Sequence, residues 1–211
     1  MLSFLFPPKC ILCRNLLTSK EINICQDCRT RVKSLSGTKR MIPFVAQWTA
    51  MWYYKGDVRK SIQRFKFYNC RHNAVVYGRL LALKLLDEYS QLPEMITWVP
   101  ISFRRRLSRG YDQSKLLAEA LGKELGIPVA STLRKIRHTK PQSTLLEASQ
   151  RRANVLGAYK AKDPRTIAGK QLLLVDDVIT TGATASECAK TLLTGGAEKI
   201  HFAAVAATPN D

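Results

Sequence analysis

The sequence predicts an α/β fold in which a parallel sheet is flanked by helices, with a small metal-held module in front of it. Short apolar runs with β-branched residues alternate with longer segments of helical periodicity, which is typical of a parallel sheet with crossover helices. Two Cys-x-x-Cys motifs fall within the first 28 residues and predict the module. We therefore expect two domains, residues 1–40 and residues 41–211.

The four N-terminal cysteines have the spacing of a structural zinc site. Cys10 and Cys13 form one motif, Cys25 and Cys28 the other, and eleven residues separate the two. The apolar start of the chain lacks the basic region and cleavage site of a secretion signal, so we expect a cytoplasmic protein with reduced thiols. Four thiolates then favour a tetrahedral Zn²⁺ over disulfides or a single redox motif. The metal has to hold this module together, because it contains few core residues of its own.

The net charge is the unusual bulk property. Against 34 Lys and Arg stand 16 Asp and Glu, which gives a net charge of +18, while residues 160–211 are balanced with six of each sign. Such an excess raises the affinity for polyanions through counterion release. Single-stranded DNA is therefore an expected partner of the first two thirds of the chain. A basic surface for solubility, or a highly charged small substrate, would also explain the excess. No apolar run is long enough to span a membrane.

Aromatic and β-branched residues at 44–54 predict a strand or hairpin, in which the aromatic side chains either enter the core or stack on bases. Asp57 is expected to cap a helix that carries Ile62 and Phe65, and Asn73 a longer one. Met95 to Pro100 is expected to be the first strand of the main sheet.

A loop with four arginines in six positions is expected after that strand: Arg104, Arg105, Arg106 and Arg109. At the carboxyl end of a strand, this cluster could hold pyrophosphate by bidentate contacts, or it could be a solvated basic loop. A helix from Tyr111 to Leu125 and a strand from Val129 to Arg134 should follow.

Residues 137–152 are polar, basic and poorly periodic, which is typical of a lid beside a site. His138, Lys140 and Gln142 are candidate residues of this flexible loop. His138 and Lys140 could assist a leaving pyrophosphate, although a histidine in a basic loop can equally be an exposed residue.

The most informative stretch lies between residues 172 and 184. Leu172 to Val175 predicts a buried strand, and Asp176 and Asp177 stand where it should end. Burying unpaired carboxylates in a core is costly, so the pair belongs at the carboxyl edge of the sheet, where open α/β sheets bind ligands. A helix to Leu193 and a strand from Ile200 complete a βαβ unit.

The turn after the acidic pair has the composition of an anion site. Its residues are Thr180, Thr181, Gly182, Ala183 and Thr184. Small side chains, a glycine and a helix N-terminus let backbone N–H groups converge on a phosphate. Carboxylates beside such a cradle suit the vicinal hydroxyls of a ribose 5-phosphate. An ordinary strand, turn and capped helix would leave the two aspartates unexplained.

This stretch resembles the phosphoribosyl pyrophosphate (PRPP) loop of the type I phosphoribosyltransferases. The resemblance implies that Asp176 and Asp177, as the catalytic pair, hold the ribose 2′ and 3′ hydroxyls, and that residues 180–184 wrap the 5-phosphate. It also implies Mg²⁺ on the ligand and, if the site turns over, displacement of pyrophosphate at ribose C1.

Further motifs along the chain resemble the ComF family of competence proteins and its GntX-like relatives. They include Tyr54-x-Gly-x-x-Arg59, Lys66-Phe67, Val99-Pro100, Arg109-Gly-Tyr-Asp-Gln113, Gln142, Arg151 and Asn154. Asp112 departs from the asparagine expected in that run. The resemblance implies a zinc knuckle on a type I phosphoribosyltransferase domain, a role in natural transformation, and a ComFA-type ATPase as partner.

Two functions are therefore expected as alternatives. The first is a competence protein that acts in DNA uptake, binds PRPP and contacts single-stranded DNA. The second is a catalytically active, Mg-dependent phosphoribosyltransferase that acts on an unknown acceptor without direct DNA contact.

Overall fold

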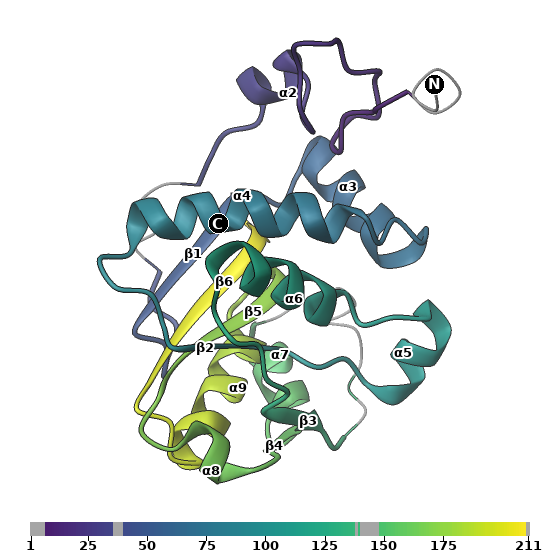
Figure 1. The fold of residues 1–211 in the computed structure, drawn as a ribbon. Coiled ribbons are helices and arrows are strands. Elements are labelled where there is room, and N and C mark those ends of the chain that lie inside the picture. The colour runs from purple at the N-terminus through teal and green to yellow at the C-terminus, as the bar shows by residue number, and fades with distance from the viewer. Residues whose placement is uncertain (1–6, 36–39, 138, 140–147, 210–211) are drawn as a thin grey trace.

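A parallel four-stranded sheet forms the centre of the protein, whose computed structural model describes residues 7–35, 40–137, 139 and 148–209. The strand order is β1-β6-β5-β2, and every neighbouring pair is parallel (Figure 1). The strands are β1 (Gln47–Tyr53), β2 (Met95–Trp98), β5 (Gln171–Ile179) and β6 (Lys199–Ala207). The apolar run 172–175 lies in β5 and is fully buried, as expected for a strand covered on both faces.

Helices cover both faces of the sheet (Figure 1). On one face lie α3 (Gly56–Phe67), α4 (Asn73–Glu88) and α6 (Gln113–Leu125), and on the other α8 (Pro164–Ile167) and α9 (Ala183–Thr194). Leu173 and Val175 pack against the first group, whereas Leu172 and Leu174 pack against the second. The remaining helices are α2 (Gln26–Arg31), α5 (Phe103–Arg109) and α7 (Ala148–Val155).

The close crossing of α4 and α6 depends on a glycine. A Cβ atom at Gly78 would lie 2.7 Å from the Cβ atom of Ala120 and 2.9 Å from backbone atoms of α6. Any larger residue at this position would push α6 away from α4. The crossing matters for function, because the N-terminus of α6 reaches the carboxyl edge of the sheet.

The N-terminal module packs directly onto α3 and α4. Ile11 and Leu12 belong to the same hydrophobic core as Phe65 and Tyr77. Ser61 donates a hydrogen bond to the Ile11 carbonyl, and a guanidinium nitrogen of Arg64 donates to the same carbonyl over 3.0 Å. The module thus shares its core with the rest of the chain, and a domain boundary at residue 40 stays a prediction.

Two expectations for strands were wrong. Met95 does not begin the main sheet, because β1 already forms its opposite edge. The segment 129–134 does not form one strand: Val129 makes a single bridge to Ile96, and β3 (Leu133–Lys135) pairs antiparallel with β4 (Tyr159–Ala161) in a separate sheet. The apolar pattern indicates that a segment is extended, but it does not encode which strand is its partner.

Helix starts also differ slightly from the expected ones. Asp57 and Asn73 lie in the first turns of α3 and α4 instead of preceding them. Asp112 is the N-cap of α6, where its Oδ1 atom accepts from the backbone N–H groups of Ser114 and Lys115. In the described part of the chain, no helix has the length and apolar character needed to cross a bilayer.

Candidate functional site

A cavity of about 840 Å³ opens at the carboxyl ends of β2 and β5. The last residue of β2, Trp98, pairs with Val175, whereas β5 continues alongside β6 to Ile179. We expected the strand to end at the acidic pair, but β5 continues past it to Ile179, so the pair lies within the last part of β5. Because β2 has already ended, one side of this segment of β5 is open to the cavity, whose walls come from α3, α5, α6, β3 and the turn before α9.

The two aspartates contact two different helices on the same face of the sheet. Asp177 forms a salt bridge with Lys66 of α3, with 2.8 Å between Oδ1 and Nζ. Asp176 accepts a hydrogen bond from Ser114 of α6 over 2.7 Å and one from the backbone N–H of Asp177 over 2.8 Å. The helices α3 and α6 thus hold the acidic pair from one face of the sheet.

The protein compensates only part of this negative charge. Burial, followed by the neighbouring charge of Asp177, raises the pKa of Asp176 to about 7. Asp177 Oδ2 is buried and accepts no hydrogen bond from the described residues. Asp177 therefore offers a buried oxygen atom to a donor that comes from outside the protein.

The turn after β5 has the geometry of an anion cradle. Gly182 adopts a φ of +79° and is the N-cap of α9. A Cβ atom there would approach Ile42 to 3.3 Å, so both the backbone and the packing favour glycine. Thr180, Gly182 and Thr184 line the cavity, while Thr181 and Ala183 complete the turn, with the Ala183 N–H donating to Thr181 Oγ1 over 3.4 Å.

The arginine cluster forms the helix α5 instead of a loop. Helical spacing places Arg105 and Arg109 on one face, and both line the cavity. Arg104 and Arg106 are exposed, and neither is among the residues that line it. Arg105 donates to the Thr139 carbonyl over 2.9 Å, and Arg109 donates to Gln113 Oε1 over 2.9 Å.

Lys135 is a cavity residue that the sequence analysis missed. Its Nζ atom donates to the Tyr159 hydroxyl over 3.2 Å, and burial, followed by the charge of Arg105, lowers the pKa of Lys135 to about 8. Within the described part of the chain, neither Lys135 nor Arg105 forms a salt bridge. The missed signal is alternation in β3: Lys135 stands two positions after the buried Leu133 and thus on the inward side.

Lys66 and Ser114, which hold the acidic pair, were not predicted as site residues either, since their role depends on helices that meet the strand only after folding. His138, Lys140 and Gln142, the predicted residues of the flexible loop, all lie outside the described residues.

The four N-terminal cysteines come together as expected. Their Sγ atoms all lie within 4.8 Å of one another, and those of Cys13 and Cys25 are 3.6 Å apart. Tetrahedral zinc with bonds of about 2.3 Å requires sulfur atoms about 3.8 Å apart, whereas a disulfide bond is about 2.05 Å long. Burial raises the pKa of the Cys10 thiol, but backbone N–H groups, first that of Cys25, outweigh it and lower this pKa to about 7. The donor set fits a structural Zn²⁺.

Comparison with known proteins finds one domain over the cysteine cluster and another over the acidic pair and the turn. A double zinc ribbon domain matches residues 1–39, and a phosphoribosyl transferase domain matches residues 112–211. Competence protein F of Haemophilus influenzae is 32% identical over 226 residues, covering 95% of this chain and 97% of that protein. The chain belongs to the ComF family. The expected fold, a type I phosphoribosyltransferase domain with an N-terminal four-cysteine zinc module, is thereby confirmed.

Other relatives of this ComF protein cover less of the chain. The DNA utilization protein YhgH of Escherichia coli O157:H7 is 34% identical over 153 residues, which are 70% of this chain and 66% of that protein. The glutamine PRPP amidotransferase of B. subtilis aligns in structure with a TM-score of 0.47 and 20% identity, covering 67% of this chain and 30% of that one.

Proposed function

We propose that this ComF protein acts in natural transformation, binds PRPP with Mg²⁺ in the cavity and contacts single-stranded DNA. One observation carries the proposal: buried acids, a glycine turn at a helix N-terminus and cations without a salt bridge among the described residues surround the same cavity. Among the described residues, one buried oxygen atom of the acids lacks a hydrogen-bond donor and these cations lack an anion. A phosphorylated sugar supplies both the donor and the anion.

We propose one orientation for PRPP in the cavity. Its ribose hydroxyls donate to Asp176 and Asp177, which satisfies the buried Oδ2 atom of Asp177. Its 5-phosphate accepts from the backbone of the turn at Gly182, at the N-terminus of α9. Its pyrophosphate lies near Arg105 and Lys135, whose mutual repulsion an anion relieves.

Mg²⁺ would bind together with the ligand. Carboxylate and phosphate oxygens are the ligands that Mg²⁺ prefers, and the acids at the cavity supply the carboxylates. When bound, the ion would stabilise the negative charge that develops on a departing pyrophosphate. The protein's own part is to orient the ribose and to surround the pyrophosphate with Arg105, Arg109 and Lys135.

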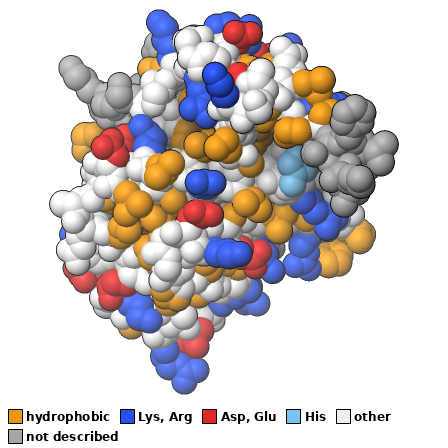
Figure 2. All heavy atoms as spheres, turned by 45° about the horizontal axis from the view of Figure 1, so that its top comes forward, with side chains coloured by type: hydrophobic (Ala, Val, Ile, Leu, Met, Phe, Trp, Pro, Cys, Tyr) orange, Lys and Arg blue, Asp and Glu red, His pale blue; other side chains and the backbone are white. Residues whose placement is uncertain are grey.

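The DNA part of the proposal is supported by charge and by the names of the relatives. Lys and Arg side chains are spread over the whole face in Figure 2 instead of forming one patch. A net charge of +18 attracts a polyanion without fixing where it binds. A cytoplasmic location and a ComFA-type ATPase as partner belong to the same proposal.

Catalytic turnover on an unknown acceptor, without direct DNA contact, is the second candidate function. The observation that favours it is the pKa of Asp176, which at about 7 suits a group that accepts a proton from an incoming nucleophile. Release of pyrophosphate from PRPP in the presence of a candidate acceptor, abolished by Asp176→Asn, would support turnover.

Titration calorimetry tests PRPP binding. The wild-type chain should bind PRPP in the presence of Mg²⁺, and the double variant Asp176→Asn/Asp177→Asn should lose most of the affinity. Glu119→Gln is a matched control, because it also removes one carboxylate but lies on the exposed side of α6. If the wild-type chain produces no binding heat, the PRPP proposal is wrong.

A further inference from the structure

The outer wall of the cavity is not used by PRPP as placed above. It consists of one side of α3 and the residue two positions beyond the helix, and it contributes Arg59, Gln63, Phe67 and Asn69 to the cavity lining. Phe67 is the apolar member and is 62% exposed. A large aromatic side chain at the mouth of a polar cavity offers a free face to a planar ligand.

Phe67 is held in place by α5. The guanidinium carbon of Arg109 lies 4.8 Å from the centre of the Phe67 ring, and Arg109 is itself fixed by its hydrogen bond to Gln113. One ring face thus rests on a cation. A base that stacks on the ring would meet an aromatic surface and a positive charge together, the combination that binds nucleic-acid strands.

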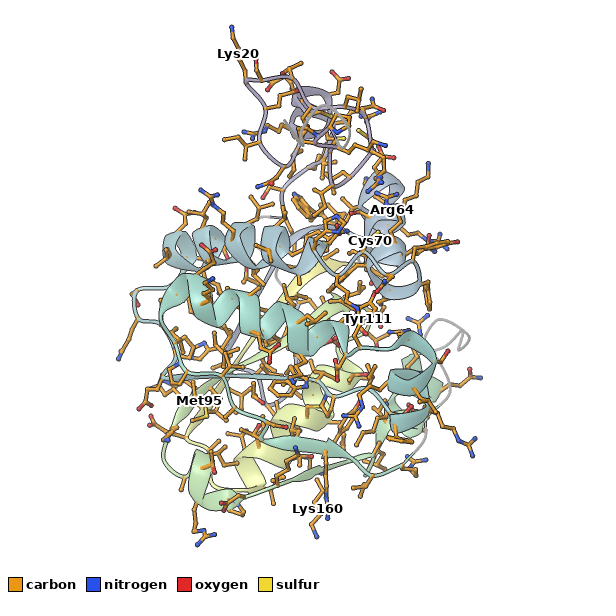
Figure 3. The ribbon with its side chains drawn as sticks, turned by 45° about the vertical axis from the view of Figure 1, so that its right-hand side comes forward. Lys20, Arg64, Cys70, Met95, Tyr111 and Lys160 are labelled. Atoms are coloured by element: carbon orange, nitrogen blue, oxygen red, sulfur yellow. The ribbon has the colours of Figure 1, made fainter. Side chains whose placement is uncertain are left out.

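The ends of α3 and α5 are tied together by further contacts. The Tyr111 hydroxyl donates to the Phe65 carbonyl, and the guanidinium carbon of Arg71 lies 4.8 Å from the centre of the Tyr111 ring. Figure 3 shows Tyr111 and Cys70 on the same side of the molecule, at the junction of these two segments. The wall is therefore a preorganised surface, which lowers the entropic cost of binding.

Polar groups on this wall can form further hydrogen bonds. Among the described residues, neither the Gln63 amide nor the Arg59 guanidinium takes part in a hydrogen bond or salt bridge. The side-chain oxygen Oδ1 of Asn69 accepts a hydrogen bond from Arg71 over 2.8 Å. The side-chain amide nitrogen of Asn69 is left as a donor for a ligand. Amide groups recognise base edges, and arginines bind phosphates.

Phe103 shows that exposure of a phenylalanine does not by itself make such a wall. It is 69% exposed, and the guanidinium carbon of Arg106 lies 5.6 Å from its ring centre. Phe103 does not line the cavity, however, and the lining residues near it belong to the opposite face of α5. Of these two phenylalanines, Phe67 is the one that lines the same cavity as Gln63, Arg59 and the acidic pair.

We propose that the wall formed by Arg59, Gln63, Phe67 and Asn69 binds one base of a single-stranded nucleic acid, stacked on Phe67 beside the phosphoribosyl site. This inference rests on the proposed function and assigns its DNA contact to the cavity mouth. The strand and PRPP then occupy neighbouring parts of one cavity. The base could belong to a single-stranded nucleic acid or to a free nucleotide. We assign the site to the single-stranded nucleic acid, because phosphates that flank the base would engage Arg59 as well.

Fluorescence anisotropy with a short labelled oligothymidylate tests the site. Phe67→Ala should weaken binding by about 5- to 100-fold, the range expected for the loss of one stacked base. Phe67→Trp should restore or improve binding, and Phe103→Ala, the matched control, should change it by less than about twofold. Equal effects of Phe67→Ala and Phe103→Ala, or no effect of Phe67→Ala, would overturn the assignment.

Photo-crosslinking tests the site without any variant. A strand that carries 5-iododeoxyuridine should crosslink the wild-type chain at Phe67 or Asn69, as mapped by mass spectrometry, and excess unlabelled strand should prevent it. Crosslinks confined to the zinc module would refute the proposal, and so would complete competition by an equal concentration of thymidine monophosphate.

The two proposals can fail separately. Calorimetry should find Mg²⁺-dependent PRPP binding retained in Phe67→Ala, and this retention also shows that the variant is folded. Crosslinking at Phe67 in a chain that does not bind PRPP would remove the proposed function and keep the base site. PRPP binding without crosslinking at this wall would remove the base site and keep the PRPP part of the proposed function.

Discussion

The zinc module and the cavity are both clusters of buried polar groups, but they are assembled differently. All four metal ligands lie between residues 10 and 28, and a guanidinium nitrogen of Arg31 donates to one of the four sulfurs, that of Cys28. The cavity collects its charges from α3, α5, β3 and β5, and Lys66 and Asp177 balance each other in a salt bridge. From this difference we expect the module to need its metal to fold, whereas contacts between the protein's own elements hold the cavity in shape.

The largest effect should come from removing a zinc ligand. Cys28→Ser should abolish stoichiometric zinc and lower Tm by about 10 °C or more, because zinc contributes on the order of 10 kcal/mol to isolated zinc modules and 1 kcal/mol corresponds to about 2–4 °C at this length. Metal analysis and calorimetric melting measure both. Cys70→Ser is the control, since Cys70 lies outside the cluster and should leave zinc and Tm unchanged. Less than half an equivalent of zinc in the wild-type chain would contradict the account.

The next effect concerns the balance of charge in the cavity. Lys66→Met leaves Asp177 buried without its partner and should lower the free energy of unfolding by about 3–5 kcal/mol in urea titrations. Adding Asp177→Asn should restore most of the loss. Lys60→Met, which removes a longer and exposed contact of 3.9 Å to Asp57, should cost at most about 0.5 kcal/mol. Equal costs for the two single variants would show that the cavity does not depend on this pair.

The pH dependence of the free energy of unfolding should depend on the protonation of Asp176. Burial raises its pKa to about 7, above the value of an unfolded chain near 4, so the folded state holds the proton more tightly. The contribution of the protonated Asp176 carboxyl to the free energy of unfolding is complete below pH 4 and is lost as the pH rises through 7. In Asp176→Asn, the free energy of unfolding should therefore fall less between pH 5 and pH 8 than in the wild-type chain. Parallel curves would contradict this assignment.

The smallest effect should come from the turn. Gly182→Ala places a side chain at a φ of +79° and should cost about 1–2 kcal/mol of stability. It should also weaken PRPP binding by roughly tenfold, since N–H groups of the turn shift. Gly169→Ala has a comparable φ of +66° and open space around it, away from the cavity, so it should affect stability and leave PRPP affinity intact.

Local patterns in the sequence predicted the parts of the structure that depend on local geometry. The Cys-x-x-Cys spacing predicted the metal cluster, and the run of 172–184 predicted a strand, a turn with glycine and a helix. The arginine run predicted a basic loop that could hold pyrophosphate, but treating it as a loop hid the helical spacing that selects Arg105 and Arg109 over Arg104 and Arg106.

The remaining site residues depend on tertiary contacts. Lys66, Ser114 and Lys135 reach the acidic pair or the cavity from three separate elements, and no spacing in the sequence links them to Asp176. The place of β1 in the sheet was hidden for the same reason, because strand order follows from packing and crossover connections and not from the apolar pattern.

The most direct test of the central claim is a crystal structure of the chain with Mg²⁺ and PRPP. We expect the 5-phosphate at the turn of residues 180–184, the ribose hydroxyls within hydrogen-bond distance of Asp176 and Asp177, and the pyrophosphate beside Arg105 and Lys135. A structure in which PRPP is bound elsewhere, while the turn holds no phosphate and Asp177 contacts only Lys66, would contradict it.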